Sequence, residues 1–130
     1  MNTSSEDRGA LRIRVVGAVI ERDGCVLMAR RPPGRRHAGL WEFPGGKVEP
    51  GEDDPSALAR ELLEELAAPS VVGELVAEGG DDRVVLACYR VRLLAQPIPL
   101  FHDQLAWIPI PQLRGIETPP ADQAAVRALT

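Results

Sequence analysis

The sequence has little of several features that mark specialised classes of protein. Aromatic residues make up only 4% of its 130 positions, and there are two cysteines. The longest uncharged stretches, such as residues 93–102, reach about half of the roughly 20 residues that a membrane span needs. Cys25 and Cys88 stand alone, without a CxxC motif or a nearby histidine. We therefore expect no membrane span and no structural zinc site, and we predict two buried, reduced thiols.

A strong positive charge is also absent. Fifteen lysines and arginines against 19 aspartates and glutamates give a net charge of −4, which argues against stable binding to nucleic acid. The length and average composition predict one globular domain over residues 11–130 after a flexible tail over residues 1–10, as a monomer or homodimer. The first residues lack the charged and apolar regions of a signal peptide, so we expect a cytoplasmic protein.

Hydrophobic periodicity predicts an α/β fold with strands, a helix, further strands and a closing helix in this order. The turn at Asp23–Gly24 separates two apolar runs that are expected to pair as a hairpin. Asp54 is expected to cap a helix that has Pro55 as its first residue and ends near Ala67. The predicted strands cover residues 11–20, 25–29, 71–77 and 84–94 and a short segment around residue 107, and the closing helix covers residues 121–129.

The helix that starts near residue 55 has one apolar and one acidic face. At 100° per residue its leucines gather on one side, while Glu61, Glu64 and Glu65 lie together on the other. Such a face can be merely solvated, yet these glutamates are like-charge neighbours at i,i+3 and i,i+4, with Arg60 as the only cation on the helix. A divalent cation would neutralise them, because Mg²⁺ binds carboxylate oxygens and keeps water and substrate phosphates as its other ligands.

The spacing of the charged residues is specific. Five residues separate Gly46 from Glu52, seven separate Glu52 from Arg60, and Glu-Leu-Leu-Glu-Glu-Leu-Ala-Ala follows. This pattern closely resembles the Nudix box. It departs at Ala67, where glycine is usual and whose absence should hinder a left-handed exit from the helix, and at Ala68, where a larger aliphatic is common. The segments 27–31, 38–49, 102–107 and 119–122 are also similar to MutT-like Nudix hydrolases.

The resemblance implies a Nudix α/β/α sandwich with a mixed sheet and a loop-helix-loop box. It also implies Mg²⁺-dependent hydrolysis of nucleoside triphosphates to a nucleoside monophosphate and pyrophosphate, with Mn²⁺ as a possible replacement ion. Arg60 matches a residue that orients a box glutamate, Glu61 is the leading candidate for the general base, and Glu52 is expected to buttress the loop and helix. The residues expected to bind the metal are the Gly45 carbonyl, Glu61, Glu64 and Glu65, and those expected to be catalytic are Arg60, Glu61 and Glu64.

Three residues are assigned to the substrate through the resemblance. Arg31 matches a phosphate or base contact in an arginine-rich loop that could otherwise be merely solvated. Phe43, beside the glycine turn, could stack on a base or belong to the core. Asp122 lies in a base-reading segment, although it could instead cap the closing helix. An ionised aspartate only accepts hydrogen bonds, which favours the N4 amino group of cytosine, so we expect (d)CTP or a modified cytidine nucleotide, with 8-oxo-dGTP as the alternative.

One departure leaves the general base open. Many MutT-like proteins carry a glutamate six residues before the tryptophan that matches Trp107, and this sequence has Phe101 there. His102, otherwise expected to be an ordinary loop residue, or Asp103 could replace that glutamate, or the box could act alone. The alternative from a different class is a non-catalytic nucleotide-binding Nudix-like domain. Such domains usually lose the box glutamates, whereas this sequence keeps them.

Overall fold

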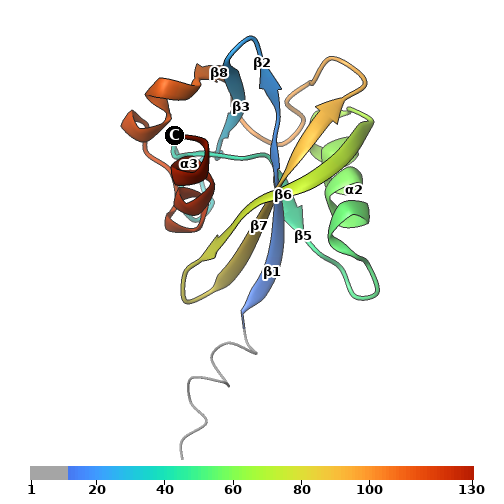
Figure 1. Ribbon diagram of the computed structural model, residues 1–130. Coiled ribbons are helices and arrows are strands. Elements are labelled where there is room, and N and C mark those ends of the chain that lie inside the picture. Colours follow the sequence, from blue (N-terminus) through green and yellow to red (C-terminus); the bar gives the residue numbers. More distant parts are fainter. Residues whose placement is uncertain (1–11) are drawn as a thin grey trace, which may run out of the picture.

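A four-stranded mixed sheet forms the centre of the molecule (Figure 1). The computed structural model describes residues 12–130, so the tail expected over residues 1–10 lies outside the described range. The strand order is β5-β1-β7-β6, with β1 parallel to β7 and the other neighbours antiparallel. The four strands are β1 (Ile13–Val19), β5 (Gly45–Lys47), β6 (Ser70–Gly80) and β7 (Val84–Leu93).

A second, antiparallel sheet is built around β3 (Cys25–Arg30), which pairs with β8 (Gln104–Pro109) along one edge and with β2 (Glu21–Arg22) and β4 (Trp41–Glu42) along the other. The expected hairpin is therefore wrong over most of its length. Only the two residues of β2 pair with β3, while β1 pairs within the central sheet. The physical reason is that β1 has apolar side chains on both faces, which only a strand between two packed layers can bury.

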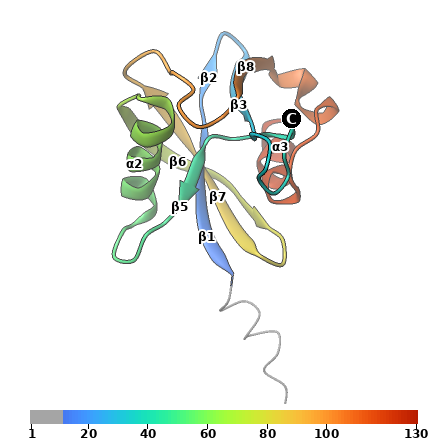
Figure 2. The same cartoon turned by 180° about the vertical axis from the view of Figure 1, so that it is seen from behind.

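Helices cover both faces of the central sheet (Figures 1 and 2). Alternate side chains of β1 point to opposite faces of the sheet. Val16 and Ala18 therefore pack in the core beneath α2 (Asp54–Leu66), whereas Val19 packs in the core beneath α3 (Gln123–Leu129). The α/β/α sandwich is therefore confirmed. The helical elements are α2 (Asp54–Leu66), α3 (Gln123–Leu129) and the 3₁₀ turns Ile110–Gly115 and Pro120–Asp122.

The N-terminal end of α2 differs from the expectation, whereas the helix ends next to Ala67 as predicted. Its N-cap is Asp53, whose carboxylate accepts a hydrogen bond from the Ser56 amide at 2.9 Å. Asp54 instead accepts hydrogen bonds from Arg14, so the prediction that it caps the helix is wrong. At the other end Ala67 adopts the left-handed conformation, with a φ of 53°. The exit is therefore kept without glycine, at a cost of about 1–2 kcal/mol.

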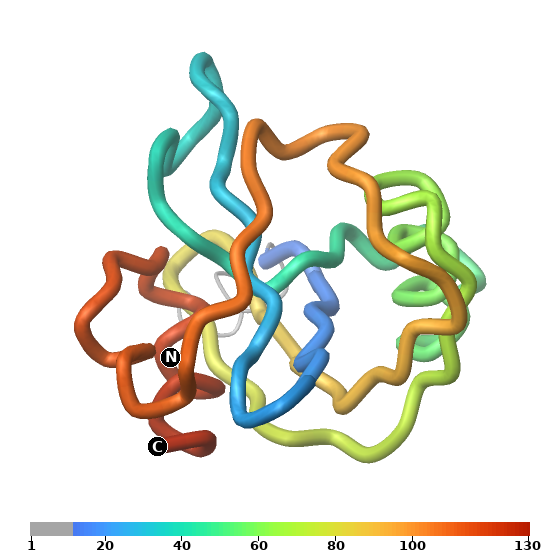
Figure 3. Tube along the Cα trace, turned by 90° about the horizontal axis from the view of Figure 1, so that it is seen from above, coloured from blue at the N-terminus to red at the C-terminus, as the bar shows by residue number. Residues whose placement is uncertain are grey.

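The remaining strands and the closing helix lie close to their predicted positions, although α3 begins only after a 3₁₀ turn. Cys88 is buried as expected, whereas Cys25 is partly exposed. Residues 31–40 form a loop that projects from the body of the molecule (Figure 3). Within residues 12–130 no helix has the length and apolar character needed to cross a membrane.

Candidate active site

The glycine turn brings β5 against the acidic face of α2. A β-carbon added at Gly46 would lie 2.2 Å from the Glu61 carboxyl carbon, and one added at Gly45 would lie 1.9 Å from the Val16 carbonyl oxygen. Glycine at position 46 therefore leaves the space that the Glu61 carboxyl group occupies. Glu61 is only 9% exposed, and burial raises its pKa although the nearby Arg60 guanidinium opposes the shift.

Arg60 connects helix α2 to the loop that precedes it. Its guanidinium donates to both carboxylate oxygens of Glu52, at 2.7 and 2.8 Å, and to the Lys47 carbonyl at 2.9 Å. The hydrogen bonds from Arg60 lower the pKa of Glu52 to about 2, and the expected role of Glu52 as a buttress is confirmed. Arg60 also lies 3.4 Å from Glu61 and 3.2 Å from Glu64. It is therefore placed to orient both glutamates.

Glu65 has the least favourable surroundings for a negative charge. Its side chain is 18% exposed, and its Oε1 atom is buried without a hydrogen-bond partner among the described residues. Burial, followed by the charges of Glu61 and Glu42, raises the pKa of Glu65 to about 8. A bound cation would relieve the unfavourable charge and satisfy the unpartnered oxygen. The donor chemistry at this position therefore fits a divalent metal ion.

The four expected metal ligands do not form a closed cage. In the described part of the chain no three acidic, histidine or cysteine side chains are grouped so that they could hold an ion. Glu64 is turned toward Arg60 and its side chain is 57% exposed, whereas that of Glu65 is 18% exposed. Mg²⁺ sites commonly use only one or two carboxylates, with water and substrate phosphates as the other ligands, so the open arrangement is compatible with such an ion.

A cavity of about 460 Å³ lies beside the glycine turn. Five of the predicted site residues line it, whereas Arg60, Glu61 and Glu64 do not. Its walls combine acidic groups with several basic side chains, a mixture suited to an anionic ligand held together with a cation. The five residues are Arg31, Phe43, Gly45, Glu65 and Asp122.

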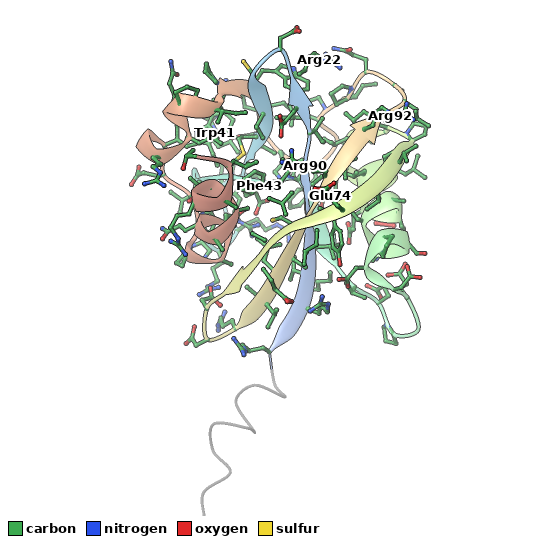
Figure 4. All side chains as sticks on the ribbon, viewed as in Figure 1. Arg22, Trp41, Phe43, Glu74, Arg90 and Arg92 are labelled. Atoms are coloured by element: carbon green, nitrogen blue, oxygen red, sulfur yellow. The ribbon has the colours of Figure 1, made fainter. Side chains whose placement is uncertain are left out.

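Phe43 belongs chiefly to the core. Its side chain packs with Met28 and Cys88, and Figure 4 shows Phe43 and Trp41 on the side of the molecule that carries α3. Its backbone amide donates a hydrogen bond to Asp122 Oδ2 at 3.0 Å. The main polar contact of Phe43 in the site is therefore made by the backbone.

Asp122 lines the cavity and is buried. It is 4% exposed, and its side chain makes no capping hydrogen bond to α3, so the capping alternative is wrong. Burial, followed by the charge of Glu42, raises the pKa of Asp122 well above its ordinary value. A protonated carboxyl group both donates and accepts hydrogen bonds. A protonated Asp122 therefore does not favour cytosine over guanine in the way that an ionised carboxylate would.

Glu42 is a site residue that the sequence analysis missed. One of its carboxylate oxygens accepts a hydrogen bond from Arg31 at 2.9 Å, and the other lies 2.8 Å from His102 Nε2. His102 lies in a loop and has a hydrogen-bond partner in Glu42, as expected, but its side chain is fully buried between Glu42 and Glu65. The available signal was an acidic residue between two aromatic residues, directly before the glycine turn.

A second cavity, of about 520 Å³, contains none of the expected site residues. It is lined by parts of β1, β2, β6 and β7, including Arg22 and Arg90, which Figure 4 labels. Arg90 is paired with Glu21, and the Arg22 guanidinium lies 4.5 Å from the centre of the Trp107 ring. Two of its cationic groups are therefore already engaged, and the cavity beside the glycine turn is the better candidate.

Known proteins are similar to this chain over most of its length. A family model described as NUDIX domain matches residues 11–129. The CTP pyrophosphohydrolase of Escherichia coli (strain K12) is 48% identical over 93 residues, which cover 72% of this chain and 67% of that protein. A protein of Mycobacterium tuberculosis (strain ATCC 25618 / H37Rv), provisionally named 8-oxo-dGTP diphosphatase 2, is 41% identical over 128 residues, covering 91% of this chain and 87% of that one.

Solved structures resemble the whole fold. The solution structure of the E. coli ORF135 protein matches with a TM-score of 0.73 and 37% identity, covering 93% of this chain and 89% of that one. The crystal structure of a MutT protein from Methanosarcina mazei Go1 matches with a TM-score of 0.74 and 27% identity, covering 91% and 90%.

Proposed function

Because this chain belongs to the NUDIX family and is a nucleotide pyrophosphohydrolase of that family, we propose that it hydrolyses nucleoside triphosphates to a nucleoside monophosphate and pyrophosphate. The observation that carries the proposal is the buried, unpartnered carboxyl oxygen of Glu65 at a cavity that also contains Arg31. A carboxylate that lacks a counter-charge can bind a metal, and an arginine beside it can bind the phosphate chain.

The proposed cofactor is Mg²⁺, with Mn²⁺ able to replace it. Glu61, Glu64, Glu65 and the Gly45 carbonyl would hold the ion, with Glu64 turning away from Arg60 to do so. The bound ion supplies charge neutralisation on the phosphate oxygens. Arg60 orients Glu61, and Glu61 is the proposed general base that removes a proton from the attacking water.

The proposed substrate is CTP or dCTP, or a modified form of either. The 48% identity to the E. coli CTP pyrophosphohydrolase supports this choice. Arg31 is proposed to contact the phosphates or the base, Phe43 to line the base site and Asp122 to read the base. The second candidate is 8-oxo-dGTP, because a protonated Asp122 can donate to the guanine O6 acceptor, and the M. tuberculosis relative points the same way.

The test is a substrate panel of ordinary, oxidised and methylated nucleoside triphosphates, with monophosphate and pyrophosphate measured as products. We expect Mg²⁺-dependent release of pyrophosphate, with the highest kcat/KM on a cytidine nucleotide. Release of a diphosphate and phosphate would contradict the proposed reaction. Nucleotide binding without turnover would instead favour the non-catalytic domain.

Two variants of Asp122 then distinguish a protonated from an ionised carboxyl group at the base site. Asp122→Asn keeps a donor and an acceptor, so it should retain most activity if Asp122 is protonated, whereas Asp122→Ala should lose it. A loss of about 1–3 kcal/mol in Asp122→Asn on cytosine substrates, and less on 8-oxo-dGTP, would support an ionised Asp122.

We also propose that the enzyme acts on the free nucleotide pool of the cytoplasm and removes nucleotides that would be harmful in DNA. The proposed form is a monomer or homodimer that binds no nucleic acid stably. Its net charge of −4 supports the last point, because phosphate backbones are bound by proteins with a basic surface.

A further inference from the structure

Two buried polar atoms face each other at the edge of the Nudix box. His102 Nδ1 and Glu65 Oε1 are both buried without a hydrogen-bond partner within residues 12–130, and they lie 4.0 Å apart. Buried polar atoms almost always have partners. A pair of unpartnered atoms at this separation therefore indicates a group that binds between them.

The other ring nitrogen fixes the chemistry of this pair. His102 Nε2 lies 2.8 Å from Glu42 Oε2, and the second oxygen of Glu42 already accepts a hydrogen bond from Arg31. Because a carboxylate paired with arginine is an acceptor, Nε2 carries the hydrogen and donates it to Glu42. In this tautomer the Nδ1 lone pair faces Glu65. A cation between Nδ1 and the ionised Glu65 satisfies both atoms.

The arrangement matches the usual surroundings of a metal-binding histidine. Such a histidine almost always donates its other ring N–H to a carboxylate, a backbone carbonyl or water, and Glu42 provides the carboxylate. With bonds of about 2.1 Å, two ligands of one ion lie roughly 3 to 4 Å apart. The separation of 4.0 Å between Nδ1 and Oε1 is within that range.

We propose that His102 Nδ1 is a further ligand of the divalent ion that Glu65 binds, held in place by Glu42. This inference rests on the proposed function, since it concerns the same ion. Phe101 offers no ligand atom, and the Asp103 carboxylate is engaged with Arg30 at 2.9 and 3.1 Å. His102 is therefore the residue of this loop that can contact the ion. An imidazole ligand also raises the preference for transition-metal ions over Mg²⁺.

The test uses Mn²⁺ alone, added to the full-length protein without nucleotide. Electron spin-echo modulation detects a ¹⁴N nucleus bonded to Mn²⁺, and we expect this coupling in the wild type. His102→Gln retains a donor near the Nε2 position, so it can still bond to Glu42, but it has no atom at the Nδ1 position. It should lose the nitrogen coupling and weaken Mn²⁺ binding at least about tenfold.

Two further variants serve as comparisons. His102→Asn places an amide oxygen near the Nδ1 position, so it should also lose the nitrogen coupling but recover part of the affinity. Asp103→Asn changes the neighbouring, exposed ion pair with Arg30 and should leave both the coupling and the affinity unchanged. Thermal unfolding of each metal-free variant checks that the fold is retained.

Wild-type protein that binds Mn²⁺ without nitrogen coupling would overturn the assignment, as would unchanged Mn²⁺ affinity in His102→Gln. If the wild type showed no nitrogen coupling but still released pyrophosphate with Mg²⁺, only the role of His102 would be wrong. Absence of both Mn²⁺ binding and hydrolysis would overturn this inference and the proposed function together.

Discussion

Substitution of Glu65 by glutamine is the most direct test of the site, because this carboxyl group destabilises the metal-free fold when it ionises. Its pKa rises from 4.5 to about 8 on folding, so the folded protein retains the proton where the unfolded chain has lost it. The stability that this proton contributes is fully present below pH 4.5, declines as the pH rises, and is lost above about pH 8. At about 1.4 kcal/mol per pH unit, the full loss is about 5 kcal/mol.

Glu65→Gln removes this titration. In EDTA the variant and the wild type should melt together near pH 5, and the variant should melt at a higher temperature at pH 9. For a chain of this length the Tm changes by roughly 3–5 °C per kcal/mol. Even a quarter of the full free energy would therefore raise the Tm of the variant by about 5 °C. With saturating Mg²⁺ the order should reverse, because only the wild type gains stability from the ion.

The assay is thermal unfolding between pH 5 and 9, with and without metal, alongside kcat for pyrophosphate release. Glu64→Gln is the matched control: this exposed residue pairs with Arg60, so its loss should bring no gain in Tm at high pH. Both variants should lower kcat by roughly two orders of magnitude or more if both glutamates bind the metal. A wild-type Tm that exceeds that of Glu65→Gln at pH 9 without metal would refute the account of Glu65. Near-normal kcat in both variants would refute the metal site.

Three other substitutions test single features. Gly46→Ala should displace the Glu61 carboxyl group, because the added β-carbon would lie 2.2 Å from its carboxyl carbon. We expect kcat to fall at least about tenfold. A normal kcat would show that Glu61 can move freely. Ala67→Gly should relieve the left-handed strain at φ 53° and raise the free energy of unfolding by about 1 kcal/mol in urea titration; an unchanged midpoint would contradict that strain. Phe101→Glu should support activity, measured as kcat with Mg²⁺, since it adds a carboxylate beside the cavity, whereas loss of activity would show that the phenyl ring is needed there.

The elements that the sequence predicted well are those determined by local patterns. The amphipathic pattern of α2 and its end near Ala67 depend on a few consecutive turns, and the box spacing places Glu52, Arg60 and Glu61 on one continuous loop and helix. Strand pairing is not local in this sense. The run after residue 11 and the run after Asp23–Gly24 look like the two arms of a hairpin, yet β1 pairs in parallel with β7, about 70 residues downstream.

The contacts of Glu42 could not be predicted for the same reason. Glu42 and His102 are 60 positions apart and meet only because β4 and β8 both pair with β3. Burial also changes the chemistry of a residue that the sequence can propose for the site. The motif predicts a role for Asp122, but an ionised carboxylate at this position would need contact with water. The folded protein buries Asp122 and raises the pKa of its carboxyl group.

The distribution of paired and unpaired charges shows how an acidic chain can accept an anionic substrate. Arg31 is held by Glu42 and by the Arg36 carbonyl, at 2.9 and 2.5 Å, so it is preorganised beside the cavity. Glu65, in contrast, has no cationic partner within hydrogen-bond distance among the described residues. Without a metal ion, the only positive charge that can neutralise the Glu65 carboxylate is a bound proton, so a triphosphate entering alone would bring its negative charge close to this group. A triphosphate entering with divalent metal would bring the missing counter-charge, so metal and substrate should bind with positive coupling.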